Sequence, residues 1–162
     1  MKIKTVIIED IKSYIETLKI MLSIYPQIEI VATASNKAEG VDVLKKHMPD
    51  LVFMDIQLGK NSGFEILEEC SDYYKTVIFI TSHEEYAIKG YNYKVLHYLL
   101  KPFDEDALSI AINKTNRHFE NQTNIIDIRN SVFKINNLKS NKIFFPDRNV
   151  HHAIEVDSII YI

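Results

Sequence analysis

The sequence predicts an α/β protein: a doubly wound domain with a five-stranded parallel sheet, followed by a short β-rich C-terminal segment. Three observations support this prediction. Short apolar runs that end in polar residues alternate five times with stretches of helical periodicity in residues 1–120. Five βα units in about 120 residues are typical of a doubly wound domain, and the right-handedness of parallel crossovers leaves few topologies. Beyond Phe119, strand-like patterns replace the helical ones.

The strands of the predicted sheet are short apolar runs bounded by turns. We expect them at residues 3–8, 28–32, 51–55, 76–80 and 95–100. Four of these runs lead into polar side chains suited to chemistry, but the second ends in Ala32, Thr33 and Ala34. Ligands of open parallel sheets bind outside the carboxyl ends of the central strands, so we expect the second strand at an edge. The predicted strand order is therefore 2-1-3-4-5, which is the flavodoxin-like order.

The predicted helices combine apolar residues at helical spacing with capping residues. We expect helices at about residues 11–25, 36–48, 63–71, 82–91 and 104–119. Asn36 with Glu39 three residues later, and Ser82 with Glu85, are capping-box patterns that mark the starts of the second and fourth helices. Asp104 caps the last helix. The polar residues 120–124 that follow predict a linker.

The composition is that of a globular protein with no general affinity for nucleic acid. Charged residues make up 25% of the 162 residues, hydrophobic residues make up 46%, and the formal net charge is −3. The single cysteine, Cys70, excludes an internal disulfide and is expected to be a buried, inert thiol in a reducing compartment. The sequence has no signal peptide and no apolar stretch near the roughly 20 residues of a membrane span. We therefore expect a cytoplasmic protein that does not bind membranes.

Polar side chains follow four of the predicted strands. The first strand leads into Glu9 and Asp10, the third ends at Asp55, the fourth runs into Thr81, and the fifth runs into Lys101. The carboxyl ends of parallel strands share one edge of the sheet, so these side chains are expected to converge on one small surface. Three acids, a hydroxyl and a lysine suit a divalent cation together with a phosphoryl group.

The three acids predict a magnesium site. Close carboxylate pairs repel each other by about 4 kcal/mol at a separation of about 4 Å and an effective dielectric constant of about 20. Mg²⁺ removes this repulsion, prefers oxygen ligands and is often shared between carboxylates and a phosphate. We expect Asp10 and Asp55 as direct ligands, Glu9 as a ligand through water, and the backbone carbonyl of Gln57 as a further oxygen.

With a cation in place, Asp55 becomes a candidate nucleophile toward phosphorus. Carboxylates form acyl phosphates in other proteins by this route. The charge on the phosphoryl oxygens then needs partners, and we expect Lys101 to pair with one oxygen and Thr81 to donate a hydrogen bond to another.

These motifs together resemble the receiver domain of bacterial two-component response regulators over residues 2 to about 120. The resemblance rests on Glu9-Asp10, Met54-Asp55-Ile56-Gln57-Leu58, Ser62-Gly63-Phe64, Ile80-Thr81-Ser82 and Tyr98-Leu99-Leu100-Lys101-Pro102-Phe103. It implies that Asp55 is the phosphoacceptor, that Thr81 is a switch hydroxyl and that Tyr98 is a switch aromatic which changes rotamer as Thr81 moves. It also implies that Glu9 and Asp10 form the metal site, that Lys101 pairs with the phosphate, and that the Lys101–Pro102 bond is cis.

One residue departs from the family pattern. Gly59 stands where the family usually has proline after the phosphoacceptor. We expect this change to loosen the loop without removing a ligand.

The segment Ser82-His83-Glu84-Glu85-Tyr86-Ala87, with Tyr98 to Phe103, resembles the subgroup of regulators whose output is a LytTR-type, mostly β DNA-binding domain. The segment after the receiver-like domain resembles the start of that output domain. Residues 142–145 and 150–156 predict a hairpin, and residues 159–162 begin another apolar strand. We expect a linker at 121–127 and an incomplete output domain at 128–162, cut off in a chain truncated from a longer protein. Because no basic stripe is present in this tail, DNA binding is expected only through the output domain of the full-length protein.

The resemblance implies a switch and not an enzyme. A sensor histidine kinase would phosphorylate Asp55 with Mg²⁺ as the cofactor, and a homodimer would form through the fourth helix, the fifth strand and the fifth helix. The open alternative is a stand-alone receiver-like interaction module that works without phosphorylation.

Two other classes fit the sequence less well. A haloacid-dehalogenase-like phosphatase also uses an aspartate nucleophile and Mg²⁺, but its first strand ends in an Asp-x-Asp pattern that is absent from Glu9-Asp10-Ile11. A flavodoxin-like cofactor binder needs a phosphate-cradling first loop, whereas the first loop here is acidic.

Overall fold

A computed structural model describes residues 2–82, 93–136, 142–147 and 150–155, with side chains described up to Gln122. The chain forms two compact units, Met1–Thr115 and Asn116–Ile162. The helix predicted after Ser82 and the strand predicted at 159–162 lie outside the described residues.

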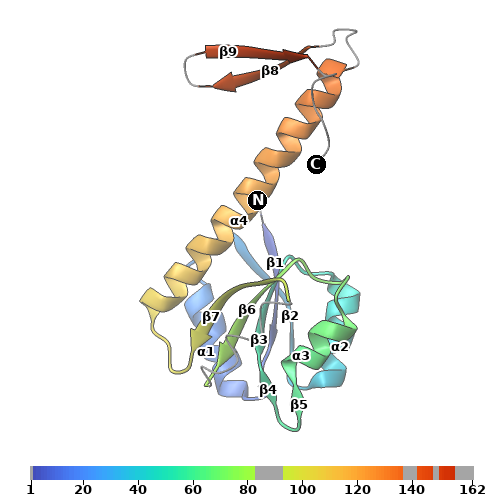
Figure 1. Cartoon of the computed structure of the whole chain (residues 1–162). Helices are drawn as coiled ribbons and strands as arrows, with labels where there is room; N and C mark the ends of the chain where they lie inside the picture. The colour runs from blue at the N-terminus through green and yellow to red at the C-terminus, as the bar shows by residue number, and fades with distance from the viewer. Residues whose placement is uncertain (1, 83–92, 137–141, 148–149, 156–162) are drawn as a thin grey trace. The chain divides into compact units, whose positions relative to one another are not determined.

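The first unit is built on a five-stranded parallel sheet (Figure 1). Its strands are β1 (Ile3–Ile8), β2 (Ile28–Ala34), β3 (Leu51–Asp55), β6 (Thr76–Thr81) and β7 (Val95–Leu100). They are hydrogen-bonded in the order β2-β1-β3-β6-β7, and all four pairings are parallel. This arrangement confirms the predicted order 2-1-3-4-5, with the second strand at one edge.

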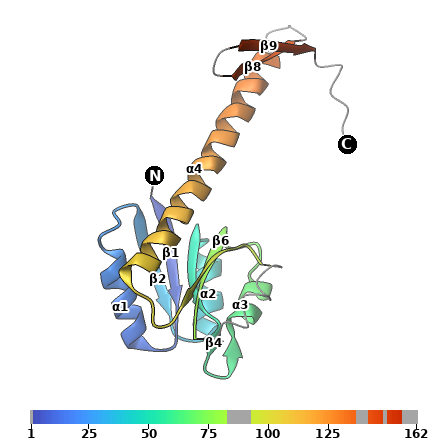
Figure 2. The same cartoon turned by 60° about the vertical axis from the view of Figure 1, so that its left-hand side comes forward.

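Helices cover both faces of the sheet. The helices α1 (Lys12–Leu22) and the first part of α4 (Glu105–Asn136) lie on one face, and α2 (Lys37–His47) and α3 (Gly63–Glu69) lie on the other (Figures 1 and 2). All five residues of β3 and all six of β6 are buried, which explains why these strands are continuous apolar runs without alternation.

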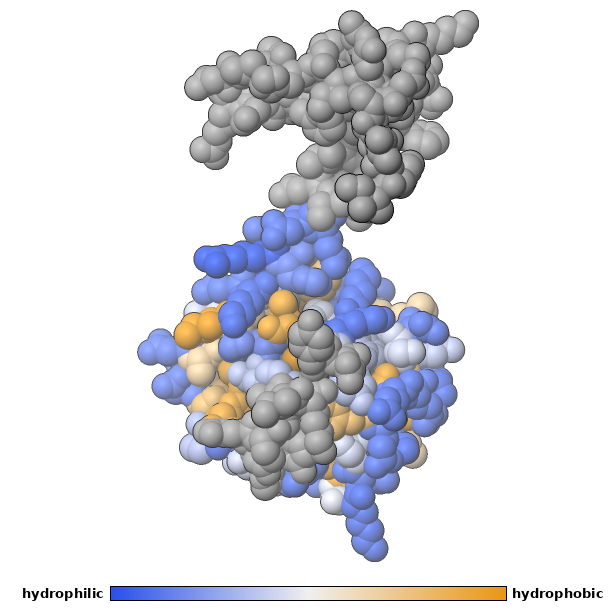
Figure 3. Space-filling view, in the orientation of Figure 1, coloured by the Kyte–Doolittle hydropathy of each residue, from blue (hydrophilic) through white to orange (hydrophobic). Residues whose placement is uncertain are grey.

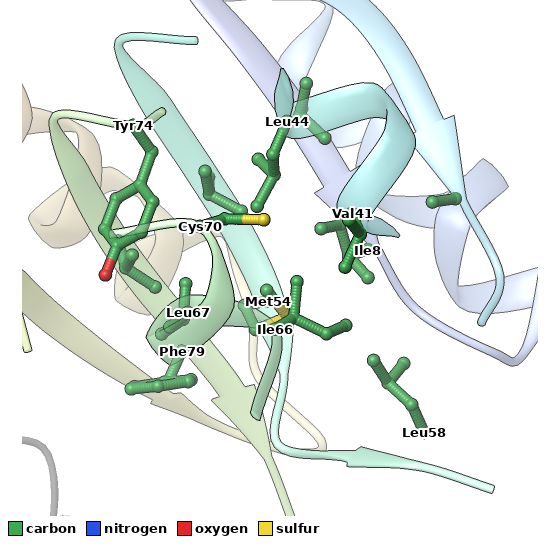
Figure 4. Close-up of a cluster of buried hydrophobic side chains, with 14 of the residues drawn as sticks. Ile8, Val41, Leu44, Met54, Leu58, Ile66, Leu67, Cys70, Tyr74 and Phe79 are labelled. Atoms are coloured by element: carbon green, nitrogen blue, oxygen red, sulfur yellow. The ribbon is translucent and has the colours of Figure 1, made fainter. Parts of the chain in front are cut away.

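The core between the sheet and α2 and α3 is continuous (Figure 4). Strand residues such as Ile8, Met54 and Phe79 pack there with Leu44 and Ile66 from the two helices. Cys70 is fully buried in the same cluster, as predicted, and burial raises the pKa of its thiol. A buried thiol with a raised pKa is a poor nucleophile, so Cys70 has a packing role.

Two predicted helix caps are confirmed in detail. The side chain of Asn36 accepts a hydrogen bond from the Glu39 N–H at 3.0 Å, at the start of α2. The Glu39 carboxylate accepts bonds from the N–H and hydroxyl of Ser35, one residue before the position expected in a capping box. At the start of α4, the Asp104 carboxylate accepts a bond from the Ala107 N–H at 2.8 Å.

A small hairpin connects the end of β3 to α3. Its strands, β4 (Gln57–Leu58) and β5 (Asn61–Ser62), are antiparallel, and Gly59 in the turn has a φ of 60°. That left-handed value favours glycine and is inaccessible to proline, whose φ is fixed near −65°. The residue that departs from the family pattern is therefore required by the conformation of this turn.

The surface of the first unit is mainly hydrophilic in the view of Figure 3, with separate hydrophobic spots. Single exposed hydrophobic side chains are normal on globular proteins. Among the described residues, no helix combines the length and the apolar character that a membrane span requires.

The structure corrects the expected secondary structure after Phe119. The helix α4 continues to Asn136, so the residues predicted as a non-helical linker, 121–127, and the strand-like stretch up to Ile135 are helical. Residues 105–136 contain neither glycine nor proline, so nothing in the sequence breaks the helix. Ile125, Ile128 and Val132 also recur at helical spacing. In a short apolar run, periodicity alone does not distinguish a helix from a strand.

The predicted C-terminal hairpin is confirmed. The strands β8 (Lys142–Asp147) and β9 (Val150–Glu155) are antiparallel, with Lys142 opposite Glu155. The proposed domain boundaries at residues 120 and 127 stay predictions.

Candidate functional site

Three carboxylates meet at the carboxyl ends of β1 and β3. Ile8 pairs with Met54 in the sheet, so Glu9, just past β1, lies beside Asp55, the last residue of β3. Carboxylate oxygens of Glu9, Asp10 and Asp55 all lie within 4.8 Å of one another. Glu9 and Asp55 are buried and Asp10 is exposed, so the cluster is open to solvent on the Asp10 side.

Lys101 joins the two buried acids. Its Nζ lies 2.6 Å from Glu9 Oε2 and 2.7 Å from Asp55 Oδ2, and its side chain is only 5% exposed. The backbone fixes this position, because the Lys101 N–H donates to the Thr81 carbonyl at 2.8 Å. The sequence prediction that Glu9, Asp10, Asp55, Thr81 and Lys101 converge at one edge is therefore met by the structure.

The pKa values of Glu9 and Lys101 reflect the opposing effects of burial and of their mutual hydrogen bond. Burial raises the pKa of Glu9 above its ordinary 4.5, although the hydrogen bond from Lys101 acts in the opposite direction. Burial also acts to lower the pKa of Lys101, but its hydrogen bonds to Asp55 and Glu9 outweigh this and hold it above its ordinary 10.5. One ammonium group thus faces three carboxylates, and the site attracts a further cation.

Each carboxylate is oriented by a backbone N–H group. The Ile11 N–H donates to Glu9 Oε1 at 3.2 Å, and the Gln57 N–H donates to Asp55 Oδ1 at 3.0 Å. Asp10 Oδ2 accepts a bond of 3.0 Å from the Gly59 N–H. These bonds leave the acids fixed in direction before any ligand arrives, which is the usual support of a metal or catalytic site.

The donor set fits Mg²⁺. Carboxylate oxygens in a cluster, one side open to water, match a cation that takes one or two protein carboxylates and keeps several waters. Glu9 and Asp55 each accept one bond from Lys101 and one from a backbone N–H, and the direct or water-mediated contact expected of each acid stays a prediction. The ligand role of the Gln57 carbonyl stays a prediction.

Thr81 and Tyr98 lie where the resemblance implies. Thr81 is the buried last residue of β6, and its carbonyl binds Lys101. Tyr98 lies on the neighbouring β7, and its ring stacks on Phe79 with centroids 5.4 Å apart. The Lys101–Pro102 bond is cis, as expected.

Three contributors to the site escaped the sequence analysis. Gly59 was expected to loosen its loop, but its N–H group binds Asp10. Gly63 was recognised only as part of a motif, although a Cβ there would lie 2.4 Å from the Asp55 carbonyl oxygen. Tyr14 on α1 places its ring 4.3 Å from Lys101 Nζ. The spacing of residues in the sequence does not predict these contacts, because the fold brings the contacting segments together.

Replacing Gly59 with proline should lower the free energy of unfolding by at least about 1 kcal/mol, because it removes a hydrogen bond to a carboxylate and forbids the observed φ. Gly59→Asn retains the N–H and tolerates positive φ better than other side chains, so it should lose less. Urea unfolding of both variants measures the two losses, provided that the dependence of the unfolding free energy on urea concentration is the same in both. Equal losses in the two variants would contradict a role for the Gly59 N–H.

The chain belongs to the response regulator receiver domain family. The family model, described as the response regulator receiver domain, matches residues 5–113, which include the acidic cluster, Thr81 and Lys101. The resemblance predicted from the sequence motifs is thereby confirmed.

The relatives of the chain include proteins named sensory transduction protein LytT and transcriptional regulatory protein BtsR. The chain is 34% identical over 104 residues to the sensory transduction protein LytT of Enterococcus faecalis, covering 63% of this chain and 43% of that protein. It is 37% identical over 107 residues to the transcriptional regulatory protein BtsR of Escherichia coli K12, covering 65% and 45%. A LytT of Bacillus anthracis matches at 25% identity over 163 residues, covering 99% of this chain and 65% of that protein. The chain thus spans less than two thirds of each of these relatives.

Solved structures show the same fold. The response regulatory domain of protein mrkE from Klebsiella pneumoniae has a TM-score of 0.67 at 23% identity, covering 73% of this chain and 98% of that one. A CheY-like receiver domain protein from Methanospirillum hungatei has a TM-score of 0.64 at 21% identity, covering 75% and 99%. The flavodoxin-like receiver fold predicted from the sequence is confirmed.

Proposed function

We propose that this protein is a cytoplasmic phosphorylation switch in which Asp55 accepts a phosphoryl group from a sensor histidine kinase. The observation that carries the proposal is the bridge made by Lys101 between the buried acids Glu9 and Asp55, beside the exposed Asp10. A charged lysine held against the candidate nucleophile is the partner that a phosphoryl group on that nucleophile requires. The receiver family supports the same assignment.

The proposed phosphoryl transfer uses the side chains of Asp55, Lys101 and Thr81. An Asp55 carboxylate oxygen attacks phosphorus, the bond from phosphorus to the kinase histidine nitrogen breaks, and its electron pair stays on the imidazole. Lys101 then moves from Asp55 Oδ2 to a phosphoryl oxygen, and the Thr81 hydroxyl donates to another. Mg²⁺ held by Asp10 and Asp55, and by Glu9 through water, would neutralise charge on the phosphoryl oxygens.

The signal leaves the site through Thr81 and Tyr98. We infer that Thr81 moves toward the phosphoryl group and that Tyr98 changes rotamer in response, because they lie on adjacent strands, β6 and β7. The two arrangements are then states of one equilibrium, and the phosphoryl contacts shift the population between them.

The proposed output of the switch is inferred from the relatives of this chain. Because one relative is named a transcriptional regulatory protein, we propose transcription control through a LytTR-type DNA-binding output domain in the full-length protein. Homodimerisation would use the face that includes β7 and the start of α4. The protein would accept and lose its phosphoryl group slowly and would not act as an enzyme on other substrates. A phosphorylation-independent interaction module is the competing function.

Intact-mass measurement after incubation with a small phosphodonor tests the proposal. The wild type should gain one phosphoryl group only when Mg²⁺ is present, and Asp55→Ala should gain none. Asp42→Ala, which removes an exposed aspartate on α2, should gain the phosphoryl group as the wild type does. Folded wild-type protein that gains no phosphoryl group would favour the interaction module instead.

A further inference from the structure

Lys101 has a third neighbour besides its two carboxylate partners. Its Nζ lies 4.3 Å from the centre of the Tyr14 ring, within the distance of a cation–π contact. Two of the three N–H groups of the ammonium have acceptors, Glu9 Oε2 and Asp55 Oδ2. Among the residues that the structure describes, the ring is thus an attractive contact for this charge in addition to the two carboxylates.

The start of α1 explains how the ring reaches the site. Tyr14 lies in the first turn of the helix, where its N–H donates to the Ile11 carbonyl at 3.0 Å. Helical side chains lean toward the helix N-terminus, which here is the loop that carries Asp10. Tyr14 is 37% exposed, whereas the Lys101 side chain is 5% exposed, so the ring is the more solvent-accessible partner of this contact.

We propose that Tyr14 is a positioning residue whose ring face holds the Lys101 ammonium group beside Asp55 and Glu9. The role of the ring during phosphoryl transfer rests on the function proposed above. During transfer Lys101 exchanges the Asp55 oxygen for a phosphoryl oxygen, and the ring keeps the ammonium group in place through that exchange.

The positioning is tested first in the protein without phosphate or Mg²⁺. Protons on the Lys101 carbon next to Nζ should show an upfield ring-current shift in the NMR spectrum of the wild type. Tyr14→Phe should retain the shift, because it keeps the ring, and Tyr14→Leu should lose it. A Lys101 signal with the same upfield shift in wild type and Tyr14→Leu would overturn the contact. This readout does not depend on phosphorylation, so it stands even if Asp55 accepts no phosphoryl group.

The electrostatic nature of the contact is tested by fluorination. Phenylalanine at position 14 with an increasing number of ring fluorines keeps its shape while the negative potential of the ring face declines. The rate of phosphoryl transfer to Asp55 from a small phosphodonor should fall along this series. Tyr14→Leu should be about two- to five-fold slower than wild type, the loss expected for one partly exposed cation–π contact.

Two results would distinguish the cation–π contact from simple packing and the positioning of Lys101 from the proposed phosphorylation. A rate that falls in Tyr14→Leu but stays constant along the fluorinated series would show packing alone and overturn the proposed role. A wild-type protein that takes no phosphoryl group, with the ring-current shift present, would overturn the proposed function and leave the positioning of Lys101 by Tyr14 supported.

Discussion

Replacing Lys101 with methionine should lower the free energy of unfolding by about 3–5 kcal/mol at neutral pH, the cost of leaving buried charge without its partner. The side chains of Lys101, Glu9 and Asp55 are 5%, 3% and 8% exposed, so water screens this triad little. Methionine preserves most of the side-chain volume, and the loss therefore reports the missing charge and hydrogen bonds. Urea unfolding measures it.

The loss should depend on pH in a defined direction. Removing Lys101 removes the hydrogen bond that acts to lower the pKa of Glu9, so this pKa rises further above 4.5. A carboxyl group with a higher pKa in the folded than in the unfolded state makes the folded state less stable as pH rises through that window. The difference between wild type and variant should therefore be largest at neutral pH and shrink as pH falls toward 4.5.

An exposed ion pair provides the control for this experiment. Lys45 lies 3.2 Å from Glu69, with both side chains more than 40% exposed. Because such surface pairs contribute little, Lys45→Met should change stability far less than Lys101→Met. A Lys101→Met loss that matched the control, or that did not change with pH, would contradict the buried charge triad.

Replacing Gly63 with alanine should lower the free energy of unfolding by about 2–4 kcal/mol and weaken Mg²⁺ binding, because the added atom forces apart two backbone segments. A Cβ at Gly63 would lie 2.4 Å from the Asp55 carbonyl oxygen and 2.9 Å from Met54 Cγ. The Gly63 N–H also donates to the Ile56 carbonyl at 2.8 Å, so the hairpin has little freedom to move away. Displacing Asp55 disturbs the proposed phosphoacceptor and the acidic cluster together.

Gly40 is the matched control. A Cβ there would lie 3.0 Å from Ile66 Cδ1, the end of a flexible side chain, and Gly40 is inside α2, where alanine has the higher helix propensity. Gly40→Ala should therefore be close to neutral in urea unfolding and should leave the Mg²⁺ affinity measured by calorimetry unchanged. Similar losses in both variants would argue against a special role of the Gly63 contact.

The five-stranded sheet was predictable because its signals are local. Each buried strand is a short apolar run, and the polar residue that ends it marks the functional edge, as Asp55 and Thr81 show. The prediction failed after Phe119 for an equally physical reason. A polar stretch without glycine or proline costs a helix little, so α4 continues to Asn136.

The sequence by itself determined which residues are suited to phosphoryl and metal chemistry, since they follow strands whose carboxyl ends share one edge of a parallel sheet. Glu9, Asp55 and Lys101 were identified in this way, and they meet at one edge of the sheet. Only the tertiary structure decided how that chemistry is supported. Gly59 binds Asp10 across 49 positions in the chain, and the ring of Tyr14 on α1 contacts Lys101, which directly follows β7. Such contacts depend on distances between segments far apart in the sequence, and residue type and spacing contain no record of those distances.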